Sequence, residues 1–349
     1  MFKTRMTELF GIKHPIMLAG MNWITDPKLV STVCNAGGLG VLAIAHCTPD
    51  ETRKQIKEVK GLTDKPFGVN QILIGPNAKE NLQVAIEEKV PVINYSLGKP
   101  WFIDQVHAYG GKVMGTIAIA KHAAKAAQLG CDALVITGHE AAAHGDVATS
   151  LVLIPIVASQ VNIPLIAAGG FYDGRGLAAA LSLGADAISM GTRFIVTKES
   201  NVHENYKQLV LKATEQDTLY GKAFDGMDGR VLKTKGAQNM MKGGFPVTEA
   251  FKGAKEVKDL MGLSYPKFIA MSFQMMGQEE GHPLIVLARQ AAGNRRHLMA
   301  LTKGDVNEGI MFAGQNVGGI KDIPSVQEVM ERTIAEAEAV LDKLQKERV

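Results

Sequence analysis

The residues with the clearest chemical potential lie in a short loop that contains two histidines. Residues 138–146 read Gly-His-Glu-Ala-Ala-Ala-His-Gly-Asp and follow an apolar segment at 133–137. The small residues leave room for a planar ligand, and an imidazole titrates near neutral pH, so it can take a proton from a carbon acid or return one to a product. We predict that His144 is the catalytic residue of this loop. The alternative for either His144 or His139 is an ordinary solvated side chain.

Two glycine turns have the composition of a phosphate site. They span residues 167–170, Ala-Ala-Gly-Gly, and 189–192, Ser-Met-Gly-Thr. Glycine lets the backbone approach an anion without a Cβ in the way, and the second turn also offers N–H donors and a hydroxyl. Either turn alone could simply be a tight connection. Arg193 follows directly and would either add a positive charge or point into the protein.

Two asparagines follow apolar segments near the amino terminus. Asn22 lies in the segment Gly-Met-Asn at 20–22, and Asn70 ends the segment at 66–70. A carboxamide both donates and accepts hydrogen bonds, which suits the polar edge of a flavin ring. Trp23 would either cover such a ring or cap the core.

These residues need a scaffold, and the hydrophobic pattern predicts one. Eight short apolar segments alternate with stretches of helical spacing, and Asp26, Thr48 and Asp173 each stand at a helix start signal. Alternating strands and helices predict a parallel sheet, and strands that are apolar on both faces favour a (β/α)8 TIM barrel over an open doubly wound sheet. The predicted strands are 14–18, 39–45, 66–73, 90–96, 112–118, 133–137, 164–170 and 187–192.

The predicted barrel accounts for only part of the 349 residues. We expect residues 1–199 and 303–349 to form the barrel with an amphipathic helix at 325–344 packed on it. Residues 200–302 would then be an additional, mostly helical region that serves as a lid, a substrate region or a dimer contact. Nine of the 16 methionines lie at 227–311, which suits an adaptable apolar surface, although methionine also fills gaps in ordinary cores.

Composition excludes several classes of partner. The formal charge is +3 and the basic residues are dispersed, so we expect no nucleic-acid binding. No apolar run is long enough to span a bilayer and no signal peptide is evident at residues 1–20, which predicts a cytoplasmic protein with no membrane partner. The three cysteines lack metal-ligand spacing and sit among apolar neighbours, which predicts buried reduced thiols and no metal site; they are Cys34, Cys47 and Cys131.

Taken in order, these motifs resemble the nitronate monooxygenase family, formerly called 2-nitropropane dioxygenases. The resemblance covers the whole predicted barrel and implies FMN and flavin redox chemistry. The family also contains NAD(P)H:quinone reductases and FMN-dependent enoyl-acyl-carrier-protein reductases. The motifs that carry the resemblance are residues 20–23, 35–40, 65–70, 138–144, 168–170 and 190–194.

The resemblance implies a role for each matching residue. His144 would be the base or proton donor, Asn70 would touch the isoalloxazine ring, and Thr137 and Ala142 would line it. A segment at 303–315 would return to the flavin edge and contribute Gln315. The full set of expected cofactor-binding residues is Gly20, Met21, Asn22, Asn70, Thr137, Ala142, Gly169, Gly170, Ser189, Met190, Gly191, Thr192 and Gln315.

Two departures from the family pattern bear on the substrate. Residues 141–143 are Ala-Ala-Ala where the family usually has Ala-Gly-Gly, and Thr137 stands where the monooxygenases often have glutamine. We therefore predict an oxidoreductase in which FMN exchanges hydride or electrons with NADH or NADPH and a small organic substrate. The alternatives are a nitronate monooxygenase that uses oxygen without NAD(P)H, an enoyl-acyl-carrier-protein reductase, a non-redox phosphate-ligand isomerase or aldolase, and a flavin-binding scaffold. A homodimer is the expected assembly if the chain self-associates.

Overall fold

Eight parallel strands form a closed barrel. Each strand pairs with its neighbours in the sequence, and β8 closes the barrel by pairing with β1. The computed structural model describes residues 2–75, 77–142, 144–242, 255, 258, 264–266, 269 and 284–348. The eight predicted strands are thereby confirmed, each trimmed by a few residues at most. Their bounds are β1 Ile16–Leu18, β2 Leu39–Ala43, β3 Phe67–Ile72, β4 Val92–Ser96, β5 Lys112–Ile117, β6 Ala133–Thr137, β7 Leu165–Ala168 and β8 Ala187–Met190.

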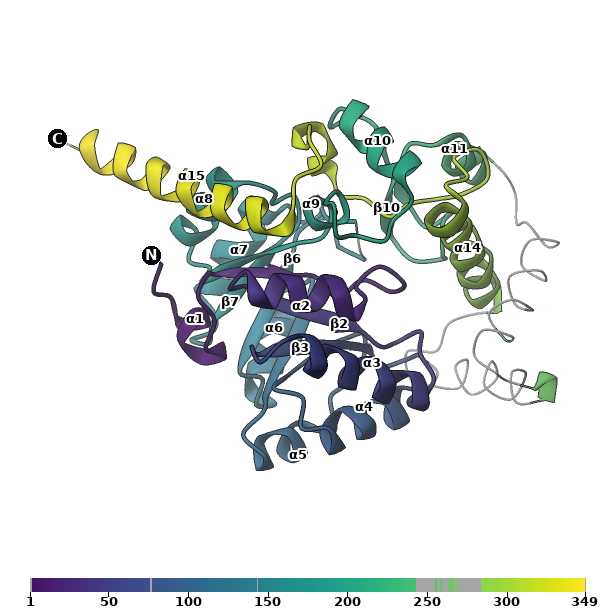
Figure 1. Ribbon diagram of the computed structural model, residues 1–349, viewed down its shortest axis with the longest axis horizontal. Helices are drawn as coiled ribbons and strands as arrows, with labels where there is room; N and C mark the ends of the chain where they lie inside the picture. Colours follow the sequence, from purple (N-terminus) through teal and green to yellow (C-terminus); the bar gives the residue numbers. More distant parts are fainter. Residues whose placement is uncertain are drawn as a thin grey trace. The chain divides into compact units, whose positions relative to one another are not determined.

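Helices follow the strands and cover the barrel (Figure 1). Asp26, Thr48 and Asp173 are N-caps as predicted, because each side chain accepts a hydrogen bond from the first turn of its helix. The predicted carboxy-terminal helix begins at Ser325 with a capping box and packs against α8. The helices of this unit are α1 Arg5–Phe10, α2 Pro27–Asn35, α3 Pro49–Leu62, α4 Ala78–Glu87, α5 Ile103–Ala108, α6 Ala120–Gln128, α7 Ser150–Ala158, α8 Gly174–Ser182, α9 Thr192–Ile195 and α15 Val326–Lys346.

The barrel interior is a packed core that is closed at one end. Alternate strand residues point inward, and the inward cluster includes Leu39, Ala133 and Ala187 from the strand starts. Met6 and Phe10 of α1 belong to the same cluster, so α1 closes the end at which the strands begin. A ligand is therefore left with the opposite end, where the strands finish.

The chain divides into two compact units: the barrel unit, residues 1–141, 145–200 and 322–349, and a second unit, residues 142–144 and 201–321. Residues 303–321 group with the second unit, whereas we expected them to belong to the barrel. The physical reason is pairing, because Phe312 bridges Val231 and Ile310 packs in the same small core. The elements of this unit are α10 Glu204–Lys212, β9 Thr218–Gly221, β10 Gly229–Leu232, α11 Lys235–Lys242, α14 Leu284–Lys303 and the 3-10 helix η1 Gln315–Gly319.

The second unit is only partly helical. Strands β9 and β10 form an antiparallel hairpin, which the hydrophobic pattern did not predict. Much of the methionine-rich stretch lies outside the described residues, including Met261, Met271, Met275 and Met276. The adaptable surface proposed for that stretch therefore stays a prediction.

The cysteine prediction is confirmed, because all three thiols are free and buried. Burial raises the pKa of Cys34 and of Cys47 to about 12, which keeps these groups in the unreactive thiol form. Among the helices that the structure describes, none combines the length and the apolar character needed to cross a bilayer. No group of three or more potential metal-ligating side chains occurs within the described residues.

Candidate active site

The open end of the barrel carries a row of uncharged polar side chains. The inward positions of β4 and β5 end in Asn94 and Thr116, two residues beyond the buried Val92 and Met114, and Asn70 of β3 pairs in register with Asn94. Asn94 Nδ2 donates to Asn70 Oδ1 at 2.7 Å and lies 3.1 Å from Thr116 Oγ1. Asn70 Nδ2 in turn lies 3.4 Å from the carbonyl oxygen of Gly20. The same end therefore joins β1, β3, β4 and β5 through neutral amides and a hydroxyl.

Gly20 and Gly191 bring two predicted segments against this row. A Cβ on Gly20 would lie 2.5 Å from the Cβ of Asn70, so only glycine fits at that position. A Cβ on Gly191 would lie 3.3 Å from the Sδ of Met21. The loop after β1 and the turn after β8 are thus close neighbours, as a shared ligand requires.

The turn after β7 has the backbone that a phosphate site needs. Gly169 and Gly170 adopt φ values of +106° and +82°, which residues other than glycine rarely adopt. Ser150, the first residue of α7, donates a hydrogen bond of 3.0 Å to the carbonyl oxygen of Gly169. Glu140 accepts from the backbone N–H of Ser150 at 2.9 Å, so the turn is held from the side of the β6 loop.

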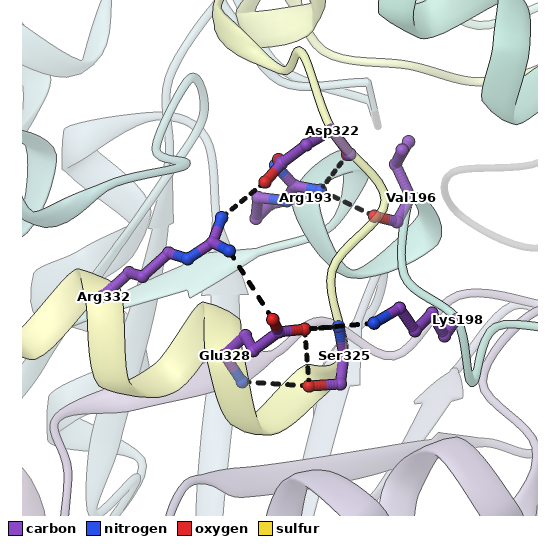
Figure 2. Close-up of polar contacts among 7 residues, drawn as sticks. All are labelled: Arg193, Val196, Lys198, Asp322, Ser325, Glu328 and Arg332. Atoms are coloured by element: carbon purple, nitrogen blue, oxygen red, sulfur yellow. Dashed lines mark hydrogen bonds and ion pairs between the residues drawn. The ribbon is translucent and has the colours of Figure 1, made fainter.

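Arg193 turns into the protein, where both of its terminal nitrogens are hydrogen-bonded (Figure 2). Only 6% of this residue is exposed. Its guanidinium donates to Asp322 Oδ1 at 3.0 Å and to the carbonyl oxygens of Val196 at 2.6 Å and Asp322 at 2.8 Å. Of the two roles that the sequence left open, the structure therefore supports the inward one. Short helix α9, which begins at Thr192, is tied by this arginine to the segment that leads into α15.

The segment that leads into α15 is also held by ion pairs with the first turns of that helix. Asp322 also pairs with Arg332, and Glu328 accepts from Ser325 and Lys198, as Figure 2 shows. Most of these charges are exposed, so each ion pair contributes little on its own. Their joint effect is to hold the turn after β8 at one place on the barrel.

His144 forms an ion pair inside the second unit. Its Nε2 lies 2.6 Å from Oδ2 of Asp225, a residue 81 positions away in the chain, and Oδ1 of Asp225 accepts from the backbone N–H of Met227 at 3.1 Å. The side chain of Asp225 is 9% exposed and that of His144 is 29% exposed. Asp225 therefore fixes the ring through Nε2, which leaves Nδ1 as the nitrogen able to exchange a proton with a ligand.

Opposing effects act on the pKa of His144. Burial lowers it, but the charge of Asp225, the hydrogen bond to Asp225 and the charge of Asp228 together outweigh burial, so the pKa is raised. The imidazole consequently keeps its proton to higher pH than a free histidine does. No local sequence signal identified Asp225, because the pairing depends on the folding of the second unit.

A second histidine of this unit has the opposite chemistry. His297 on α14 is buried, and its Nδ1 lies 3.2 Å from the carbonyl oxygen of Ile310. Burial lowers its pKa to about 4, so it is neutral at pH 7. The ring of Phe312 lies 5.4 Å from His297 and 6.4 Å from His144, measured between ring centroids.

The structure divides the predicted site residues between the two units. Ala142 belongs to the second unit, where its carbonyl oxygen accepts from the N–H of Arg230 at 3.0 Å, and Gln315 begins η1. Trp23 adopts φ +62° and its ring centroid lies 5.2 Å from that of His46. The barrel unit holds Gly20, Met21, Asn22, Asn70, Thr137, Gly169, Gly170, Ser189, Met190, Gly191 and Thr192; the second unit holds Ala142, His144 and Gln315.

Comparisons with known proteins decide the family. Residues 3–336 match the family model described as nitronate monooxygenase. The chain belongs to the nitronate monooxygenase family. It is therefore an oxidoreductase of that family, and the resemblance found in the sequence is confirmed.

Three relatives of this family member cover nearly its whole length. The (3aS,4S,5R,7aS)-5-hydroxy-7a-methyl-1-oxo-octahydro-1H-indene-4-carboxyl-CoA dehydrogenase of Rhodococcus jostii (strain RHA1) is 38% identical over 347 residues, 98% of each chain. The enzyme of the same name from Mycobacterium tuberculosis (strain ATCC 25618 / H37Rv) is 38% identical over 346 residues, 96% of each chain. The structure of FabK from Thermotoga maritima superposes with a TM-score of 0.80 at 35% identity, over 99% of each chain.

Members of the nitronate monooxygenase family typically depend on FMN, and the barrel end fits that cofactor. The left-handed glycines after β7 and the turn into α9 after β8 lie at the two loops where barrels of this type hold phosphate. The amide and hydroxyl row suits a ring edge that carries both donors and acceptors. Because the one arginine of the second turn is paired with Asp322, a phosphate there would be held by backbone N–H groups and hydroxyls.

Proposed function

We propose that this protein is an FMN-dependent dehydrogenase or reductase that removes a hydride and a proton from an acyl thioester, or adds them to an enoyl thioester. His144 would be its proton-transfer residue. The observation that carries the proposal is the 2.6 Å pair between His144 and Asp225, a proton-transfer group with its own orienting carboxylate. The 38% identity to CoA-ester dehydrogenases along nearly the whole chain supports a thioester as the substrate class.

In this proposal the barrel residues hold the cofactor. Gly169, Gly170 and the segment Ser189–Thr192 would bind the phosphate through backbone N–H groups and hydroxyls. Gly20, Met21, Asn22, Asn70 and Thr137 of the barrel unit would contact the ring system. When bound, FMN supplies a two-electron acceptor or donor for hydride.

His144 would move the proton that accompanies the hydride. A hydrogen on the carbon next to a thioester carbonyl is weakly acidic, so its removal requires a base with a pKa near the working pH. In the dehydrogenase direction Nδ1 of His144 would take this proton, the adjacent carbon would give up its hydride to the cofactor, and a carbon–carbon double bond would form. The reductase direction would reverse both transfers. Asp225 would keep the ring oriented through Nε2 and stabilise the charged imidazolium.

Two other activities require different reactants or different residues. A nitronate monooxygenase would need oxygen and a nitronate but no NAD(P)H, and Thr137 stands where those enzymes often have glutamine. A non-redox isomerase or aldolase would need a lysine or paired carboxylates at the strand ends. The final residues of the eight strands are Leu18, Ala43, Ile72, Ser96, Ile117, Thr137, Ala168 and Met190, which does not favour that class.

The deciding experiment records the flavin absorbance of the purified protein under anaerobic conditions. NADH, NADPH, cyclohexanecarboxyl-CoA and a nitronate are added separately, and bleaching of the flavin band is followed. Bleaching by the acyl-CoA supports the dehydrogenase direction, and bleaching by NADH or NADPH supports the reductase direction with re-oxidation by an enoyl thioester. Bleaching by the nitronate alone, or a colourless protein, would overturn the proposal. Light scattering of the same sample tests the predicted homodimer.

A further inference from the structure

The asparagine row at the barrel end has a definite direction. Its members lie on four strands or strand ends, in the order Thr116, Asn94, Asn70 and Gly20. Thr116 Oγ1 lies 3.2 Å from Asn94 Oδ1, Asn94 Nδ2 lies 2.7 Å from Asn70 Oδ1, and Asn70 Nδ2 lies 3.4 Å from the carbonyl oxygen of Gly20. The last two links each join one donor to one acceptor, whereas the Thr116 hydroxyl also lies 3.1 Å from Asn94 Nδ2 and can therefore serve either atom of that amide.

The backbone carbonyl of Gly20 determines this direction. A carbonyl oxygen can only accept a hydrogen bond, so the atom of Asn70 that faces it must be Nδ2. Oδ1 of Asn70 then faces Asn94, which must present its own Nδ2, and Oδ1 of Asn94 is left to accept from the hydroxyl of Thr116. Reversing either amide would set two acceptors or two donors against each other, which would leave these groups without hydrogen-bond partners.

We infer that Asn94 is a positioning residue, which holds the Asn70 carboxamide so that its remaining N–H, and not its oxygen, is the group offered to a flavin ring. The inference rests on the proposed function, since it assumes that FMN binds at this end of the barrel. Asn94 is 4% exposed and is engaged with both neighbours. Its role is therefore to set the orientation of Asn70 from within the protein.

A fixed donor has an electronic consequence. Reduced FMN carries more negative charge on its ring than oxidised FMN, and a hydrogen-bond donor stabilises the more negative form. Loss of the donor orientation should therefore weaken the binding of reduced FMN more than that of oxidised FMN. A tenfold difference between the two losses corresponds to a fall of about 30 mV in the two-electron midpoint potential.

The test compares the midpoint potential of bound FMN in the wild type with that in Asn94→Asp and Asn94→Leu, by anaerobic spectroelectrochemistry. A carboxylate of the same shape cannot donate to Asn70, and leucine removes the polar group. In both variants we expect the potential to fall by about 30 mV, the equivalent of a tenfold change. Fluorescence titration with oxidised FMN should show a smaller loss of affinity.

The matched control lies at the start of the row. Thr116→Ser keeps the hydroxyl and should retain the wild-type potential, whereas Thr116→Val removes the donor to Asn94 and should lower the potential less than the Asn94 variants do. If Asn94→Leu or Asn94→Asp folds, binds FMN and keeps the wild-type potential, the inference is wrong while the proposed function stands. If the wild type binds no FMN, the proposed function itself has failed, and the inference fails with it.

Discussion

The open end of the barrel and the His144 region of the second unit use opposite kinds of chemistry. The barrel end presents amides, hydroxyls and backbone N–H groups, and Arg193, which follows the turn after β8, is paired with Asp322. The second unit places a histidine against a carboxylate at 2.6 Å. Neutral dipoles bind a ligand equally well over a wide pH range, whereas a titratable pair can exchange protons but depends on pH. The difference implies that cofactor binding and proton transfer can be impaired separately.

The largest expected effect comes from His144→Ala. Without the proton-transfer group, kcat should fall roughly 10²- to 10⁴-fold, while FMN stays bound because the barrel residues are untouched. Stopped-flow absorbance with the substrate that bleaches the flavin measures the loss. His139→Ala is the matched comparison, since the same loop holds both histidines and His139 lies 3.0 Å from the carbonyl oxygen of Asp146. Equal losses in the two variants would contradict the assignment of His144.

Acid stability tests whether a buried histidine makes each unit sensitive to low pH. Burial lowers the pKa of His297 in the second unit and of His46 in the barrel unit to about 4. A lowered histidine pKa leaves stability intact above the unfolded value of about 6.5 and removes it as the pH falls toward 4. At pH 5 each residue should cost about 2 kcal/mol of unfolding free energy.

Urea denaturation at pH 7 and pH 5 measures this cost. His297→Gln and His46→Gln should each reduce the difference between the two pH values by about 2 kcal/mol. A full-sized difference that survives in His46→Gln would show that His46 contributes none of the acid sensitivity. The contrast between the two regions would then extend from their chemistry to their stability.

Asp225→Asn keeps His144 but removes the carboxylate that orients and charges its ring. The amide removes the charge that raises the pKa of His144, so burial prevails and the pH limb of kcat/KM that belongs to this histidine moves to lower pH. Turnover should fall roughly 10- to 100-fold, as expected for losing a charge-assisted hydrogen bond of about 1.5–3 kcal/mol. A pH–rate profile gives both quantities. A limb that stays in place would assign it to another group.

The smallest effect is expected from Gly170→Ala, which tests FMN binding by the barrel unit alone. Gly170 has φ +82° and a Cβ there would lie 3.3 Å from the Cβ of Glu140, so alanine should strain the turn and weaken FMN binding about tenfold. Gly110→Ala is a matched control, because Gly110 has φ +83°, no atom within 4 Å of its Cβ position, and lies just before β5 at the other end of the barrel. Fluorescence titration should show weaker binding for Gly170→Ala only, and the pH limb of His144 should not move in either variant.

The barrel was predictable because its signals are local. The period of the apolar residues and caps such as Asp26 and Ser325 identified the strands and helices before any contact was known. The hairpin of β9 and β10 was missed, since its short strands have no clear alternation, and residues 303–321 were assigned to the barrel although Phe312 pairs with β10. Pairing between distant segments leaves no periodic pattern in either of them.

The sequence by itself determined the family, the order of the barrel strands, and the candidates His144, Asn70 and the two glycine turns. Only the tertiary structure revealed that Asp225 orients His144 and that Arg193 pairs with Asp322. It also revealed that Asn94 and the carbonyl oxygen of Gly20 set the orientation of the Asn70 amide. The reason is physical. Residue type and spacing specify which groups could act, but hydrogen-bond direction and pKa depend on partners that folding brings from far along the chain.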